Sequence, residues 1–185
     1  MKFAFLFVSA PLLICTSAFA GSAANLIPNG NFATSLDGWT CSGTCNWIEQ
    51  GSQDDGTGAV DIPRLGASIL TSSCFPIQPQ TAYDVSFDAW ANIGLVSAEF
   101  LMTCRAYAGT DCDQPTGNFS YVPLYYFGSG WQGVEGQHDT AAGEHSAMCE
   151  VNFSSNVGET RMDSFVFTFN HRLDGIYADG FEGSE

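Results

Sequence analysis

Acidic and aromatic side chains recur at alternate positions along two predicted strands. From Tyr83 to Ala91 apolar residues alternate with polar ones, which is the pattern of a strand with one buried face. A second alternating run extends from Leu95 to Tyr107. We expect the outward positions of both strands to share one surface that mixes carboxylates, a guanidinium and aromatic rings: Asp88, Trp90, Glu99, Arg105 and Tyr107.

This mixture of side chains is suited to binding sugars. Aromatic rings lie against the C–H faces of sugar rings, while carboxylates and guanidinium groups bond to the hydroxyls. The segment 121–131 would add a wall to such a site through Tyr125 and Tyr126. The same rings would also serve to cover the outer face of a sheet, so binding and packing both stay open for Trp90 and Tyr125.

Catalytic chemistry has less support in the sequence. The histidines His138, His145 and His171 form no H-x-x-x-H or H-E-x-x-H pattern, and no G-x-S-x-G motif occurs. Asp88 and Glu99 on neighbouring strands would reach the roughly 5–9 Å that separates the two carboxylates of a glycosidase. Any acid-rich sheet offers that spacing, and we therefore predict a protein that is not an enzyme.

Turn residues divide the rest of the chain into short strands. No amphipathic helical pattern is longer than a turn or two. The regular spacing predicts an all-β domain over residues 21–171, a two-sheet antiparallel β-sandwich, followed by an acidic tail at 172–185. Further strands are expected at about 58–63, 67–77, 119–127, 131–138, 145–154 and 162–170.

The first twenty residues have the form of a signal peptide. Lys2 precedes an apolar run, and Ala18 and Ala20 occupy the small-residue positions of a cleavage site after Ala20. No later apolar run approaches the ~20 residues of a membrane span, so we expect no membrane insertion. The sequence thus predicts a secreted or periplasmic protein.

The charge of the chain is strongly acidic. Twenty acidic residues face five basic ones, which gives a net charge of −15, and the single lysine, Lys2, lies in the predicted signal peptide. Such a field repels phosphate backbones and anionic lipids, which argues against nucleic acid as a partner. Neutral and cationic ligands remain open.

The cysteines indicate disulfides. Of seven cysteines, Cys15 lies in the predicted signal peptide, and an even number in an exported chain is typical of a disulfide framework. Cys41 and Cys45 are close enough in sequence to close one short loop through a disulfide. Paired C-x-x-C motifs are absent from the sequence, which argues against a zinc site.

The pairing of the other four cysteines depends on the predicted strands. Cys104 and Cys149 fall on the faces that the apolar residues define, so both are expected to point into the core. This favours Cys104–Cys149 together with Cys74–Cys112. A local Cys104–Cys112 bond is the alternative.

Several motifs occur in an order that resembles a known family. Asn25-Leu-Ile-Pro-Asn-Gly-Asn-Phe32 followed by Leu36-Asp-Gly-Trp39 resembles the opening of galactose-binding-like jelly rolls, the fold of several carbohydrate-binding modules. In that pattern Phe32 and Trp39 are core anchors. The segments 73–87, 130–131 and 162–167 resemble later strands of the same family. The ending 176–182 is similar to a short tail of exported proteins from some gammaproteobacteria.

This resemblance implies a structural calcium near the N-terminus. Asp163 matches the aspartate of the family's closing strand, and Asp54, Asp55 or Asp61 would serve as the acid from a loop. The family's first acidic position is Ala33 in this chain, which removes one carboxylate from a site that needs six to eight oxygens. Without the resemblance, Asp54 and Asp55 belong to a solvated turn.

Two functional hypotheses follow. The leading one is a secreted, non-catalytic β-sandwich module that binds carbohydrate, either a polysaccharide or a cell-envelope glycan. The competing one is a structural or adhesion-type exoprotein without a small-ligand site. Convergence of Trp90, Tyr107, Tyr125 and Tyr126 on one exposed groove would favour binding, whereas scattered or buried rings would favour the structural role.

Overall fold

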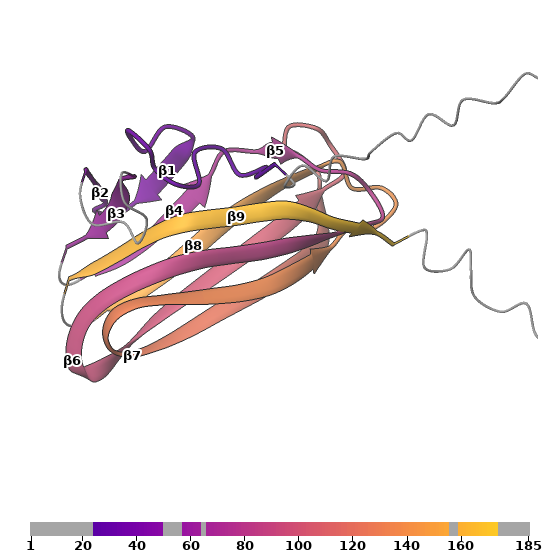
Figure 1. Cartoon of the computed structure of the whole chain (residues 1–185). Coiled ribbons are helices and arrows are strands. Elements are labelled where there is room, and N and C mark those ends of the chain that lie inside the picture. Colours follow the sequence, from indigo (N-terminus) through magenta and orange to yellow (C-terminus); the bar gives the residue numbers. More distant parts are fainter. Residues whose placement is uncertain (1–23, 50–56, 64–65, 156–158, 174–185) are drawn as a thin grey trace, which may run out of the picture.

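The protein is built from strands. A computed structural model describes residues 24–49, 57–63, 66–155 and 159–173, and these ranges hold no helix (Figure 1). The predicted all-β class is therefore confirmed. In the part of the chain that the structure describes, no helix has the length and apolar character needed to span a bilayer. The predicted signal peptide and the tail beyond Leu173 lie outside the described residues.

Two of the strands are far longer than the rest. The described strands are, in chain order, β1 (Trp39–Ser42), β2 (Asn46–Ile48), β3 (Ala59–Ile62), β4 (Gly66–Ser72), β5 (Phe75–Pro76), β6 (Thr81–Tyr107), β7 (Pro115–Asp139), β8 (Ser146–Ser155) and β9 (Thr160–Arg172). The predicted runs from Tyr83 and from Leu95 join in β6, and those at 119–127 and 131–138 join in β7.

Each of the two long strands contributes to both antiparallel sheets. The first half of β6 pairs with β9, the second half pairs with β8, and the register shifts between Asn92 and Ser97. β7 accompanies β6 along both halves, and Figure 1 shows the two strands turning over together. The first sheet has the order β7-β6-β9-β3-β2 and the second β7-β6-β8-β4-β1, with β5 beside β8. The predicted two-sheet sandwich is confirmed.

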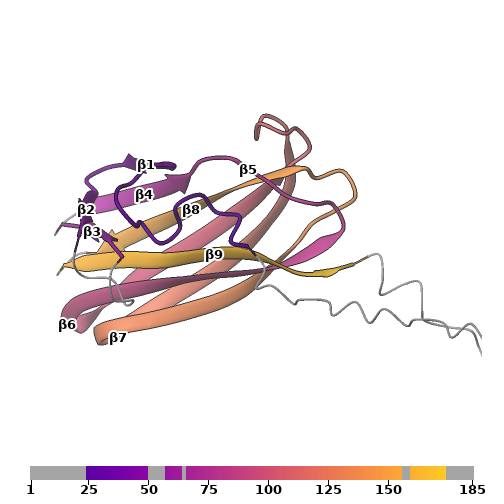
Figure 2. The ribbon, with the colours of Figure 1, turned by 45° about the horizontal axis from the view of Figure 1, so that its top comes forward.

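The core lies between the sheets and continues across the bend of β6. Phe87 in the first half and Phe100 in the second are both buried, with ring centroids 6.5 Å apart. Phe87 also stacks on Phe165 of β9 at 5.5 Å, and Phe100 contacts Phe153 of β8 at 4.8 Å. Both halves of β6 point their apolar side chains inward. The outward side chains of the first half therefore project from one face of the sandwich, and those of the second half project from the opposite face. Figure 2 shows the two layers from a second direction.

The segment before β1 closes the core near β9. Phe32 and Trp39 are buried, and both rings contact Phe165 at 5.6 and 4.8 Å. Asn25 ties this segment to β9, since its amide donates to the Phe165 carbonyl and its carbonyl accepts from the Phe167 N–H. The expected core positions of Phe32 and Trp39 are confirmed.

Three disulfides brace the sandwich. They join Cys41 to Cys45, Cys74 to Cys112 and Cys104 to Cys149. Cys104 and Cys149 stand directly opposite each other on β6 and β8, are fully buried, and have Cα atoms 4.0 Å apart. This settles the pairing in favour of Cys104–Cys149 over the local alternative. Such bonds are compatible with an oxidising compartment.

The disulfides should differ in their effect on stability. In the chain-entropy model the stabilisation grows with the enclosed loop, and the separations are 4 residues for Cys41–Cys45 and 45 for Cys104–Cys149. Replacing both cysteines of a bond by alanine should lower the free energy of unfolding by about 2 kcal/mol for the first bond and about 4 kcal/mol for the second. Urea unfolding under non-reducing conditions measures both values. A larger loss for Cys41–Cys45 would contradict the expectation.

Candidate functional site

Three aromatic rings form an exposed row on the second sheet. Phe119, Tyr121 and Tyr125 lie on β7 at alternate positions, with Pro123 between them, and are 43%, 56% and 61% exposed. Alternate residues of a strand point the same way, so the rings share the outer face. Among the described residues only one other large hydrophobic side chain is comparably exposed, Phe169 on β9. We call Phe119, Tyr121 and Tyr125 the aromatic platform.

The platform exists because β7 is apolar on both sides here. Val122 and Leu124 point inward and are buried, which forces Tyr121, Pro123 and Tyr125 outward. The rings are not scattered, since Phe119 and Tyr121 touch edge to face with centroids 4.8 Å apart. Neighbouring exposed rings on one sheet face form a candidate interaction surface.

Charged side chains from β6 flank the row. Glu99 stands directly opposite Tyr125, and Arg105 stands directly opposite Phe119. The Arg105 guanidinium lies 5.8 Å from the Phe119 ring centroid, and its Nη2 is 3.9 Å from Oε1 of Glu150 on β8. The face therefore offers flat apolar rings beside carboxylates and a guanidinium, the combination that recognises sugars.

The structure buries the Tyr107 ring, which was expected to bind a ligand, and it does not describe the side chain of Tyr126. Tyr107 is only 6% exposed, and burial raises the pKa of its hydroxyl, with Arg105 lowering it and Glu150 raising it. A ring so buried offers no face to a ligand. Tyr126 stands opposite Ala98 in the β6–β7 ladder, and its side chain lies outside what the structure describes.

Asp88 and Trp90 lie on the opposite side of the sandwich. They belong to the first half of β6, where Trp90 is paired with Trp131 of β7 and with Arg161 of β9. The Arg161 guanidinium lies 4.7 Å from the Trp90 ring centroid, and its Nη2 is 2.6 Å from Glu159 Oε1. The expected single surface therefore does not form, because β6 changes sheets between Asp88 and Glu99. These two carboxylates cannot flank one glycosidic bond.

Phe119 and Tyr121 were not among the site residues expected from sequence. The signal for them is the alternation from Phe119 to Tyr125, in which every second residue is an aromatic ring or proline. With Val122 and Leu124 assigned to the core, that alternation places the rings outside. The predicted strand at 119–127 was therefore sufficient to place Phe119 and Tyr121 on the outer face.

The residues expected to bind calcium are only partly described. Asp54 and Asp55 lie outside the described residues. Asp163 is buried and its Oδ1 accepts from the Ser164 N–H, while Asp61 stands opposite Arg161. Burial and Glu159 raise the pKa of Asp61, whereas Arg161 and Asn46 lower it.

The described acidic side chains alone do not supply the six to eight oxygens of a calcium site. In the part of the chain that the structure describes, no three His, Cys, Asp or Glu side chains gather closely enough to hold a metal. Ala33 supplies no carboxylate, and the neighbouring Phe32 carbonyl already accepts from the Trp47 indole N–H at 2.7 Å. Calcium binding stays a prediction of the resemblance.

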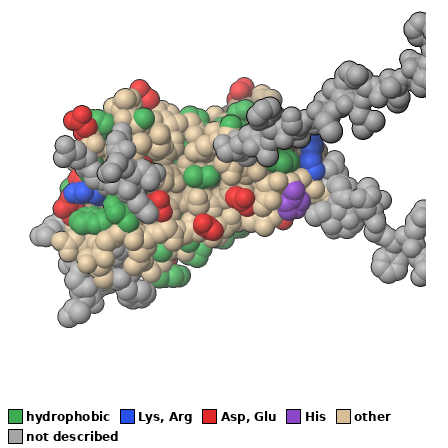
Figure 3. Space-filling model, in the orientation of Figure 1, with side chains coloured by type: hydrophobic (Ala, Val, Ile, Leu, Met, Phe, Trp, Pro, Cys, Tyr) green, Lys and Arg blue, Asp and Glu red, His purple; other side chains and the backbone are tan. Residues whose placement is uncertain are grey.

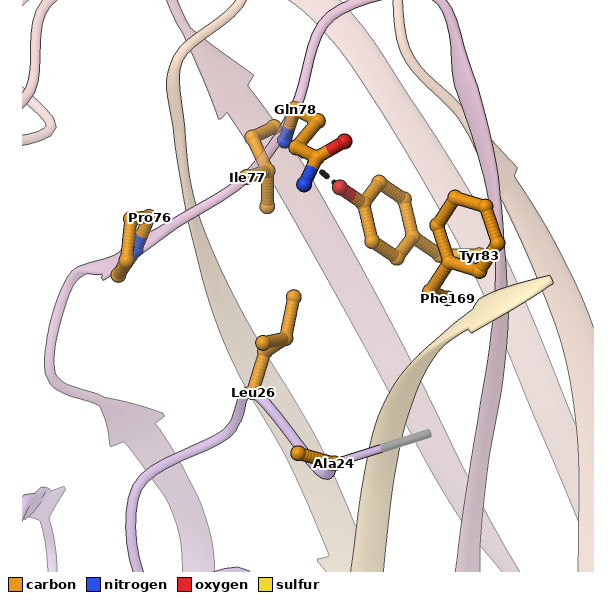
Figure 4. A pocket seen from close by; sticks show the side chains of 7 residues that line it. All are labelled: Ala24, Leu26, Pro76, Ile77, Gln78, Tyr83 and Phe169. Carbon is orange, nitrogen blue, oxygen red and sulfur yellow. Dashed lines mark hydrogen bonds between the residues drawn. The ribbon is translucent and has the colours of Figure 1, made fainter. Parts of the chain in front are cut away.

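An apolar pocket of about 490 Å³ opens where β6 begins and β9 ends (Figure 4). The Tyr83 hydroxyl accepts from the Gln78 N–H at 2.6 Å at its edge. None of the described side chains that line it is charged, which distinguishes it from the aromatic platform. The lining residues are Ala24, Leu26, Pro76, Ile77, Gln78, Tyr83 and Phe169.

A buried polar cluster holds the platform strand in place. Beneath the platform, His138 Nδ1 lies 3.1 Å from the Ser120 hydroxyl, which joins the two halves of β7. The buried Glu144 carboxylate accepts from Thr116 Oγ1 and from Asn118 Nδ2, and so fixes the beginning of the strand. Burial lowers the pKa of His138, and the carboxylates of Glu144 and Asp139 act in the opposite direction.

Acidic side chains dominate the charged residues of the chain. Figure 3 shows them scattered across the face turned to the viewer, with arginine or lysine side chains near its two ends. This distribution agrees with the net charge of −15. The surface in that view presents no basic stripe of the kind that follows a nucleic-acid backbone.

The structure is similar to those of carbohydrate-binding modules. TmCBM61, solved in complex with beta-1,4-galactotriose, has a TM-score of 0.63 and 16% identity, covering 80% of this chain and 100% of that chain. A family 16 carbohydrate-binding module has a TM-score of 0.60 and 14% identity over 78% and 99% of the two chains. No protein-family model and no curated protein matches the sequence.

Part of a phage protein has a similar architecture. The enzymatically active domain of tailspike protein 4 from bacteriophage CBA120 has a TM-score of 0.63 and 15% identity. The match covers 79% of this chain but 21% of the tailspike chain, so this chain spans about a fifth of it. At these identities the likenesses establish the fold, which is the β-sandwich jelly roll of carbohydrate-binding modules.

The buried histidine should make stability depend on pH. The folded protein resists protonation of His138, whereas the unfolded chain takes up a proton near the ordinary value of 6.5. The unfolded state therefore binds more protons as the pH falls below that value, and His138 then destabilises the fold. In the variant His138→Gln this contribution is absent.

Urea unfolding of both proteins at pH 7.5 and pH 5 measures the difference. Carboxylates titrate in both proteins, so the comparison isolates His138. The stability advantage of the wild type over His138→Gln should shrink at the lower pH. An advantage that grows would show that the folded protein binds the proton more tightly than the unfolded chain.

Proposed function

We propose that the chain is a secreted, non-catalytic module that binds carbohydrate through the aromatic platform. The observation that carries this proposal is the gathering of three of the four exposed large hydrophobic side chains, among the described residues, on one face of β7. A soluble domain keeps such rings in solvent at a cost unless they meet a ligand.

The geometry of the row favours an extended glycan. Tyr125 follows Phe119 by six positions along the strand, which corresponds to roughly 20 Å. Rings along this length would lie against successive sugar units of a polysaccharide or a cell-envelope glycan. Glu99 and Arg105 stand beside the outer rings, where they would bond to hydroxyls.

The fold and the chemistry of the chain support the other parts of the proposal. Structures of the same fold include modules solved with oligosaccharides, such as TmCBM61 with beta-1,4-galactotriose. The predicted signal peptide ending at Ala20 and the three disulfides support secretion. A non-catalytic role is supported by the position of Asp88 and Glu99 on opposite outer faces.

One observation favours the structural alternative. Tyr107 is buried and Trp90 is covered by Arg161, so the rings first expected to converge do not do so. A structural or adhesion-type exoprotein would need no accessible ring on either face. The platform rings are accessible, and they distinguish the two hypotheses experimentally.

Retention on insoluble polysaccharides, together with a glycan array, tests the proposal. Tyr121→Ala and Tyr125→Ala should each weaken binding by about 1 kcal/mol, or roughly fivefold in the dissociation constant. Phe169→Ala is the matched control, because it removes an exposed ring from the other sheet. Each variant changes an exposed side chain and should remain folded.

The outcomes separate the two hypotheses. Retention of the wild type and of Phe169→Ala, with loss in the platform variants, would support carbohydrate binding at this face. If the wild type is retained on no glycan, the structural role is favoured. Equal weakening by Phe169→Ala and Tyr125→Ala would move the site away from the platform.

A further inference from the structure

The two ends of the aromatic platform differ in charge. At the Phe119 end, Arg105 lies over the ring and faces Glu150. At the Tyr125 end, Glu99 is exposed, and its carboxylate, unlike its backbone, forms no hydrogen bond or ion pair with a described residue. The most exposed ring of the platform therefore stands beside an available carboxylate.

The outer face of the second sheet has an excess of negative charge. Its described strand residues include two carboxylates, Glu99 and Glu150, and one cation, Arg105. Arg105 faces Glu150 at 3.9 Å and lies over the Phe119 ring, so its charge is balanced by that carboxylate and leaves the charge of Glu99 uncompensated. With a net charge of −15 over the whole chain, acidic glycans are repelled before they reach the platform.

An aromatic ring beside a carboxylate is a binding arrangement for an ammonium group. The ring face attracts the cation through its quadrupole, and the carboxylate accepts charge-assisted hydrogen bonds from it. A neutral sugar would meet the same groups with ordinary hydrogen bonds only. Tyr125 and Glu99 meet this description, because they are directly opposite each other on neighbouring strands.

We infer that the Tyr125–Glu99 end of the platform selects glycans with free amino groups, that is, polysaccharides of deacetylated amino sugars. This inference rests on the proposed carbohydrate-binding function. Glu99 determines the specificity, and the aromatic rings supply affinity that is common to charged and uncharged glycans.

Three soluble tetrasaccharides test the inference by calorimetry: those of glucosamine, N-acetylglucosamine and galacturonic acid, at a pH where the amines are protonated. The wild type should bind the glucosamine tetramer about tenfold more tightly than the N-acetylated one. The galacturonic acid tetramer should bind weakest. Glu99→Gln should abolish the preference for the amine.

Glu135→Gln is the matched control for charge. Glu135 is exposed on β7 opposite Ser86, on the outer face of the first sheet, and its replacement changes the net charge by the same amount. This variant should keep the preference. An equal loss in Glu99→Gln and Glu135→Gln would assign the preference to the overall field of the protein and overturn the inference.

Failure of the inference can be told from failure of the proposed function. If the wild type binds the glucosamine and N-acetylglucosamine tetramers equally, and Tyr125→Ala weakens both, the selection by Glu99 is wrong and carbohydrate binding stands. If no tetramer binds and no polysaccharide retains the wild type, both proposals fail.

Discussion

β6 and β7 pass together from one sheet to the other, and this passage decides which side chains can meet. Alternation continues along both strands, so Phe87 and Phe100 both reach the core although they belong to different sheets. The constraint is geometric, since a strand that turns over while keeping its apolar side inward must reverse the direction of its polar side. Trp90 and Glu99 are consequently separated by the whole thickness of the sandwich.

Alternation in the sequence predicts burial well and sheet membership poorly. Val85, Phe87, Met102 and Cys104 are buried as their positions indicate, and the facing of Cys104 and Cys149 was sufficient to favour the correct disulfide. Pairing partners, however, depend on contacts between residues far apart in the chain. No local pattern distinguishes a strand that stays in one sheet from one that crosses to another.

An irregularity in the ladder accompanies a second difference. Arg105 and Tyr107 stand opposite Phe119 and Pro115, so the register shift lies in β7, while β6 stays in regular register with β8. Tyr107 is nevertheless buried where Arg105 is exposed, because alternation predicts the direction of a side chain but not what covers it. The platform lies in the regular part of β7, where the pattern does hold from Phe119 to Tyr125.

The position of β7 at the margin of both sheets has a consequence for the behaviour of the protein in solution. Among the described residues β7 pairs with β6 alone, which leaves the other side of a 25-residue strand without a neighbour. An edge of that length would normally template the addition of further strands and lead to aggregation. Pro123 has no N–H to donate, and the left-handed Gly128 and Gly130 interrupt the regular edge near its bend. The proline within the aromatic row thus also opposes the addition of a further strand to this edge.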